Sequence, residues 1–180
     1  MRRERFERAL ETLAAPVDSL DCTADLFLQT FRVTGASVST MGDVLGSATL
    51  STSNEVAARI DEIQLDLREG PCWDALATRK PVLTENVTAL PAHRWSAFKD
   101  AVSREQVGAL FAFPMFVGPT PIGAVDMYAS TPAGFTPMQV RQAVVLADLL
   151  AKQVLRLSLA SATDAPKEAR WRSRRIEERP

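Results

Sequence analysis

Residues 108–117 read Gly-Ala-Leu-Phe-Ala-Phe-Pro-Met-Phe-Val, and this almost wholly apolar run constrains the fold more than any other feature of the chain. A short run without polar alternation is typical of a strand that is covered on both faces. The turn residues Gly-Pro-Thr-Pro at 118–121 follow it, and residues 122–129 supply a partner strand. Because Pro114 cannot donate a ladder hydrogen bond, we expect it at an edge or a bulge. The sequence therefore predicts a β-hairpin inside a covered sheet.

Helices and further short strands flank this hairpin. Strand-like stretches precede it at 36–41, 45–51 and 81–84. Apolar residues at helical spacing predict helices at both ends of the chain and between the strands. One capping box, Thr52 to Glu55, indicates where a middle helix begins; a second, Thr136 to Gln139, begins a helix that runs to about Leu159. This order of elements predicts an α+β fold.

The composition describes one ordinary globular domain of 180 residues with a formal net charge of −1. We divide it into an N-terminal helix (1–18), a main domain that includes the long last helix (19–159) and a charged tail (160–180). No apolar run is long enough to cross a membrane, and the charged N-terminus lacks the core of a signal peptide. Two cysteines and one histidine are too few for a disulfide framework or a His-rich metal site. We expect a cytoplasmic protein without metal or cofactor.

Four motifs in a fixed order carry a family resemblance. They are Glu-Gly-Pro-Cys-Trp-Asp-Ala-Leu at 69–76, Arg-Trp with Phe98 at 94–98, the apolar strand from Gly108, and Ile-Gly-Ala-Val-Asp-Met-Tyr at 122–128. Together they resemble the GAF domain family, in the variant found in actinobacterial GAF–ANTAR regulators, over about residues 5 to 158. The resemblance implies a GAF/PAS-like central antiparallel sheet of five to six strands. Long terminal helices would cover one face, with loops and short helices on the other, and ligands would bind between the sheet and those loops.

Two departures from the family patterns restrict what the resemblance implies. After Leu159 only about twenty residues remain, too few for the three-helix RNA-binding ANTAR module. The Asn-Lys-Phe-Asp-Glu signature of cyclic-nucleotide GAF domains is also absent. Neither antitermination nor cyclic GMP binding is therefore carried over to this chain.

The function that we expect is a non-enzymatic sensor or interaction domain that binds a small molecule or a signalling partner. The last helix carries two adjacent apolar stripes, and one of them would stay exposed unless it were paired. We therefore predict a homodimer formed through the terminal helices. The residues expected at this interface are Phe6, Leu10, Leu13, Leu146, Leu150 and Leu157.

A ligand site is expected on the sheet face beneath the loop-rich segment 85–98. Asp126 is the informative residue, because an acidic group on an otherwise apolar strand needs either a hydrogen-bond partner or an opening to face. Such a carboxyl group would orient an amine, amide or ring nitrogen of the ligand. The expected lining is Trp95, Phe98, Phe111, Phe113, Asp126 and Tyr128.

Several alternative roles stay open at this level. Cys72 lies near the start of a short helix, where the helix dipole favours a thiolate, so a redox sensor or a Cys72-dependent enzyme is one alternative. Glu69 and Asp74 are candidate acid–base groups, and His93 is a candidate haem ligand. An RNA-associated regulator acting through the basic tail or a separate partner is the remaining alternative, although the tail has a net charge of only +2 (six basic minus four acidic residues).

Overall fold

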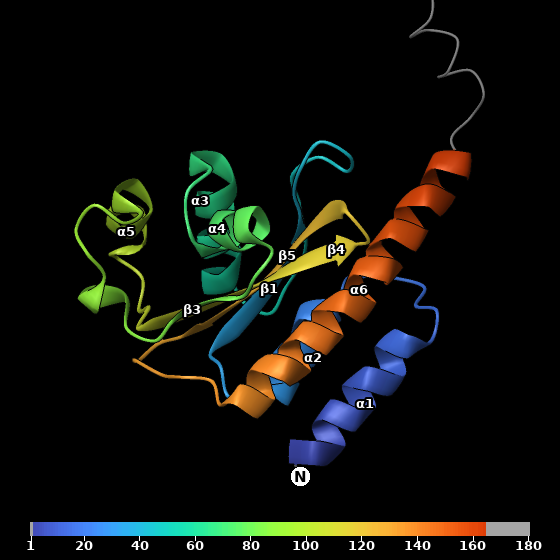
Figure 1. Cartoon of the computed structure of the whole chain (residues 1–180), viewed down its shortest axis with the longest axis horizontal. Helices are drawn as coiled ribbons and strands as arrows, with labels where there is room; N and C mark the ends of the chain where they lie inside the picture. The colour runs from blue at the N-terminus through green and yellow to red at the C-terminus, as the bar shows by residue number, and fades with distance from the viewer. Residues whose placement is uncertain (1, 165–180) are drawn as a thin grey trace, which may run out of the picture.

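A computed structural model describes residues 2–164 of the chain, and within them an antiparallel sheet separates two layers of helices (Figure 1). The sheet has five strands in the order β2-β1-β5-β4-β3 over these described residues. The strands are β1 (Gly35–Thr40), β2 (Ala48–Thr52), β3 (Val82–Thr84), β4 (Ala109–Val117) and β5 (Thr120–Ala129). The predicted α+β class is confirmed.

One face of the sheet is covered by the helices at the two ends of the described chain. These are α1 (Arg2–Ala14), α2 (Thr23–Thr30) and α6 (Pro137–Asp164). The main hydrophobic core lies between them and the sheet, because alternate side chains of β4 and β5 point to this side. Its largest fully buried members include Phe27, Phe111, Phe113, Leu13, Leu146 and Leu150.

The opposite face carries shorter elements. They are α3 (Glu55–Leu67), α4 (Pro71–Thr78), the 3-10 helix η1 (Val87–Ala89) and α5 (Ser96–Val102). Two smaller apolar clusters lie here, one beneath α3 and α5 and one beneath α4. The layer therefore divides into two parts along the sheet.

The predicted hairpin lies at the centre of the sheet. β4 pairs with β5 along its whole length, from Ala109 opposite Ala129 to Val117 opposite Thr120. The position of Pro114 is also as predicted. β3 pairs with β4 only as far as Ala112, so Pro114 lies on a free edge and needs no donor on that side.

Helix boundaries test the local predictions. The capping box at Thr136 is confirmed: Gln139 N–H donates to Thr136 Oγ1 at 3.3 Å, and Gln139 Oε1 accepts from Thr136 N–H at 2.9 Å. The box at Thr52 is wrong, because Asn54 caps α3 by accepting from the Ala57 N–H at 2.8 Å. Residues 160–164 of the predicted tail belong to α6, and residues 165–180 lie outside the described part.

Between residues 2 and 164, the helices lack the combination of length and hydropathy that crossing a membrane requires.

Candidate functional site

A buried group of polar side chains lies between the sheet and the helices α3 and α4. Asp61 and Gln64 come from the inner face of α3, and Asp126 comes from the middle of β5. Asp126 pairs with Ser37 of β1 on one side and with Ala112 of β4 on the other. The central strand thus places a carboxyl group where every strand neighbour is small, which leaves α3 and α4 to provide its other surroundings.

Asp61 is a fully partnered member of this group. Its carboxylate accepts hydrogen bonds from Ser39 Oγ at 2.6 Å, from Ser37 Oγ at 3.3 Å and from the hydroxyl of Thr49. Burial raises the pKa of Asp61, and the three hydroxyl donors oppose that rise. Asp61 therefore joins α3 to β1 and β2 and has no vacant oxygen to offer a ligand.

Asp126 differs from Asp61 in having no partner. The residue is 6% exposed, and neither carboxyl oxygen has a hydrogen-bond partner among the described residues. Burial raises the pKa of Asp126 well above its usual range, and the charge of Asp61 raises it further. The nearby Gln64 amide favours the charged form, but it makes no hydrogen bond of normal geometry with Asp126. The rise favours the protonated form, which would have one proton to donate and one oxygen free to accept.

Gln64 fastens the start of α4 above Asp126. Its Oε1 accepts from the Cys72 backbone N–H at 3.0 Å, and its backbone carbonyl accepts from the Trp73 indole at 2.7 Å. Its Nε2 has no partner among the described residues. Gly70 must be glycine here, because its φ is +132° and a Cβ would lie 2.6 Å from Gln64 Oε1. A second unpartnered polar atom therefore lies beside Asp126.

Cys72 is buried, at 1% exposure, among small side chains of α4 and the sheet. Burial and the nearby carboxyl groups of Asp126 and Asp61 raise its pKa well above the usual thiol range. This direction is the reverse of what the helix dipole alone predicts, because desolvation outweighs the dipole. The exposed Cys22 lies at the start of α2, on the other face of the sheet, so it is not placed to resolve an oxidised Cys72.

A GAF domain model matches residues 17–152, which is more than half of the chain. The chain belongs to the GAF domain family. Solved GAF domains share the fold. The GAF domain of a phosphoenolpyruvate-protein phosphotransferase from Coxiella burnetii aligns with a TM-score of 0.67 and 15% identity, over 89% of this chain and 96% of that one.

Two further solved structures show how widely this fold is used. A domain of a two-component sensor histidine kinase protein from Sinorhizobium meliloti aligns with a TM-score of 0.62 and 18% identity, over 91% of this chain and 97% of that one. Free methionine-R-sulfoxide reductase from Neisseria meningitidis, solved with its substrate, aligns with a TM-score of 0.65 and 17% identity, over 89% of this chain and 92% of that one. No curated protein matches the sequence. At these identities the likeness shows the fold alone.

The aromatic residues expected at one site divide between the two faces of the GAF sheet. Trp95, Phe98 and Tyr128 belong to the cluster beneath α3 and α5. Phe111 and Phe113 lie in the opposite core, each stacked on Phe135, with centroid distances of 4.4 and 5.9 Å. The prediction that all five line one site is therefore wrong.

Strand register explains this division. Paired residues on neighbouring strands share a face, and Tyr128 is opposite Leu110 while Phe111 is opposite Met127. Tyr128 and Phe111 therefore point to opposite sides of the sheet. Asp126 is on the Tyr128 side, as the alternation predicts, and ligand contact by Asp126 stays a prediction.

The segment 85–98 is fastened to α4 rather than free. Asp74 Oδ2 accepts from Trp95 Nε1 at 3.0 Å and from the Arg94 guanidinium at 3.3 Å. Glu69 Oε1 accepts from the Phe98 backbone N–H at 3.2 Å. Glu69 and Asp74 thus have structural partners, which argues against acid–base roles, and His93 is exposed on the loop.

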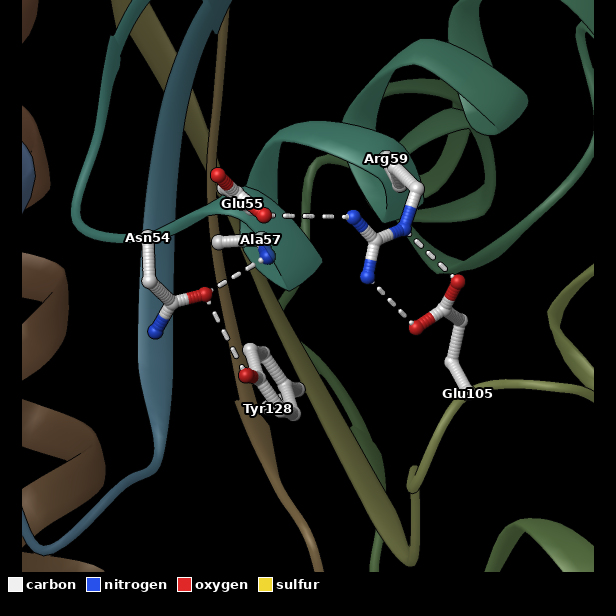
Figure 2. A network of polar contacts seen from close by, with 6 residues as sticks. All are labelled: Asn54, Glu55, Ala57, Arg59, Glu105 and Tyr128. Atoms are coloured by element: carbon white, nitrogen blue, oxygen red, sulfur yellow. Dashed lines mark hydrogen bonds and ion pairs between the residues drawn. The ribbon is translucent and has the colours of Figure 1, made fainter.

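A polar network fixes α3 from its other end, as Figure 2 shows. Arg59 donates two hydrogen bonds to Glu105, at 2.7 and 2.9 Å, and lies 3.9 Å from Glu55. The cap residue Asn54 also accepts from the Tyr128 hydroxyl at 3.3 Å. α3, which carries Asp61 and Gln64, is therefore joined to both β5 and the loop before β4.

Most of the residues expected at a dimer interface are buried within the single chain. Leu13, Leu146 and Leu150 are fully buried in the main core, because α1 packs along α6 and covers the second apolar stripe. Phe6 and Leu10 pack partly against the same core. The assignment of the three leucines to an interface is wrong, whereas dimerisation itself stays a prediction.

Asp61 and Gln64 are not among the site residues predicted from the sequence. Both are on the inner face of α3, four and seven residues after the buried Ala57. That spacing is the signal that could have found them, since polar residues on the buried stripe of a helix need partners. No group of three or more His, Cys, Asp or Glu side chains among residues 2–164 is arranged to hold a metal ion.

Proposed function

We propose that this GAF domain is a sensory module that binds a small molecule between the sheet and the helices α3 and α4. The observation that carries the proposal is the unpartnered carboxyl group of Asp126. A buried polar group without a partner costs on the order of 1 to 3 kcal/mol, so a ligand that supplied the missing hydrogen bonds would recover this free energy on binding.

The polar atoms indicate the chemical class of the ligand. In the protonated form that burial favours, Asp126 would present one O–H donor and one carbonyl acceptor, and Gln64 Nε2 would add a second donor. An amide or a nitrogen heterocycle with a donor beside an acceptor would satisfy both residues. The small side chains of Ala75, Ala112 and Ala124 belong to the adjacent buried apolar cluster, and the apolar part of a ligand would pack against them.

Binding at this site gives a route to a sensory output. Gln64 joins α3 to the start of α4, and Asp74 joins α4 to the loop before α5. A ligand that took up the Gln64 amide would shift α4 and the segment fastened to it. Such a shift would alter a surface that a signalling partner could read, and a dimer formed through α1 and α6 would carry the change to a second copy.

A thermal-shift screen with adenine, uracil, nicotinamide and aromatic amino acids tests the proposal. We expect at least one compound to stabilise the domain, and Asp126→Asn to remove that stabilisation. The matched control is Asp43→Asn, an identical change at an exposed position between β1 and β2. Circular dichroism verifies that both variants fold.

Two results would overturn the proposal. One is a stabilising compound that binds Asp126→Asn as tightly as the unchanged protein. The other is binding that shifts the backbone NMR signals of α1 or α6 and leaves those of α3, α4 and β5 unchanged.

A further inference from the structure

A cavity opens at the end of the sheet beside α5, away from Asp126. Its volume is about 760 Å³, within the range of small-molecule sites. Its walls come from η1, the end of α5, the loop before β4 and the residues after β5. Asp126, Gln64 and Cys72 are not among the lining residues, so this cleft is separate from the sensory site proposed above.

The floor of the cleft is held by backbone contacts. Val87 N–H donates to the Gly108 carbonyl at 2.9 Å, and Gly108 N–H donates to the Ala129 carbonyl at 2.8 Å. A Cβ on Gly108 would lie 2.2 Å from the backbone of Thr131, so the two segments touch directly. The cleft is therefore formed before any ligand arrives, and ordering it costs little on binding.

One wall is fixed by the ion pair seen in Figure 2. Glu105 lines the cleft, and Arg59 of α3 holds it with two hydrogen bonds, at 2.7 and 2.9 Å. The pairing lowers the pKa of Glu105, so this carboxylate is charged and already has its counterion. It offers no free negative charge to a ligand.

Lys99 gives the cleft its uncompensated charge. Lys99 and Glu105 are the charged residues among those that line it. Lys99 Nζ donates to the Pro91 carbonyl at 2.8 Å and forms no ion pair with any residue from 2 to 164. An ammonium group has three donors, so two remain for a ligand. Lys99 thus contributes a cationic side chain to the wall of the cleft, beside the apolar side chains of Val87, Val102, Val107 and Pro132, while its Nζ is bonded to Pro91 just outside the lining residues.

We infer that this cleft binds a small organic carboxylate, whose charged end meets Lys99 and whose apolar body lies against the valines. The amide of Gln106 also lines the cleft and would donate to the carboxylate, whereas the hydroxyl protons of Thr88 and Ser103 go to Asn86 Oδ1 and the Asp100 carbonyl, so these two oxygens would only accept from a substituent of the ligand. Because Lys99 is only half-buried, the attraction weakens as ionic strength rises.

Benzoate, phenylacetate and the uncharged benzamide are the probes for this inference, with binding followed by backbone NMR shifts and calorimetry. We expect both carboxylates to shift the signals of residues 87–88, 102–108 and 130–132, and benzamide to bind roughly fivefold more weakly. Lys99→Gln should weaken benzoate by a similar factor, whereas Lys152→Gln on α6 should not. Ser103→Trp should block binding by filling the cleft.

The outcome is independent of the sensory proposal, because Asp126→Asn should leave benzoate binding unchanged. Benzoate that shifts no signal at millimolar concentration would overturn the inference. Equal binding by Lys99→Gln would also overturn it, as would shifts centred on α4 and β5, since that pattern would place the probe at the Asp126 site.

Discussion

The indole N–H of Trp95 donates to Oδ2 of Asp74 over 3.0 Å, and this bond joins the loop before α5 to the middle of α4. Arg94 reaches the same oxygen, and its guanidinium stacks 4.5 Å from the Trp95 ring centroid. Trp95 has a left-handed backbone, with a φ of +49°. That conformation is costly for a tryptophan, so these side-chain contacts help to hold it.

Replacing Asp74 by alanine should loosen this attachment. We expect the free energy of unfolding to fall by about 1 to 2 kcal/mol, because the Trp95 indole loses a charged acceptor. Exchange of the indole proton with solvent should become faster. Urea denaturation and hydrogen exchange measure both effects. The control is Asp100→Ala on the exposed side of α5, and equal stability of the two variants would show that the bond contributes little.

The sheet was predictable from the sequence because its hydrophobic patterning is strong. The apolar run from Gly108 and the turn at 118–121 predict the hairpin without any tertiary information, and Pro114 has the edge position that its missing N–H requires. Asp126 was predictable for the opposite reason, since a lone acid interrupts an apolar strand. A local pattern is sufficient when burial alone decides the structure.

The contacts around Asp126 were not predictable in the same way. The Gln64 bond to Cys72 depends on a turn at Gly70, and the Trp95 bond depends on a left-handed backbone that no periodicity shows. The burial of Leu150 depends on how α1 packs against α6, which is a choice between two surfaces of similar composition. Side-chain partners and helix packing are tertiary properties.

Stability should decrease as pH rises above about 4. The pKa of Asp126 is raised in the folded state, so the native protein keeps a proton that the unfolded chain has released. The contribution of this proton to the free energy of unfolding is complete below the pKa that Asp126 has in the unfolded chain. It is lost as the pH rises toward the pKa of Asp126 in the folded protein, at up to about 1.4 kcal/mol per pH unit for one proton. The raised pKa of Asp61 acts in the same direction.

The variant Asp126→Asn separates the contribution of Asp126 to this pH dependence from that of Asp61, because an amide does not titrate. Urea denaturation from about pH 4 to neutral should show a smaller slope for this variant than for Asp43→Asn, which keeps both buried acids. Identical slopes in the two variants would mean that Asp126 is ionised in the folded protein.

The two thiols should react at very different rates. Cys22 is exposed, whereas Cys72 is buried and its pKa is raised, so little thiolate forms at neutral pH. We expect a thiol reagent to modify Cys22 promptly and Cys72 only on the timescale of local or global opening. Cys22→Ser should therefore abolish the fast phase. A fast phase that persists in this variant and disappears in Cys72→Ser would instead support a redox role for Cys72.

Leu150→Glu should unfold the domain rather than produce a folded monomer. Leu150 is fully buried in the main core, and an unpaired carboxylate there costs more than the roughly 2 to 5 kcal/mol of a leucine-to-alanine change. Val145 is 42% exposed on the same helix, so Val145→Glu should keep its fold. Circular dichroism and light scattering together decide the matter. If α6 forms the predicted dimer, Val145→Glu should weaken the dimer while leaving the melting curve unchanged. A folded Leu150→Glu monomer would contradict this expectation and would support the interface first predicted from the sequence.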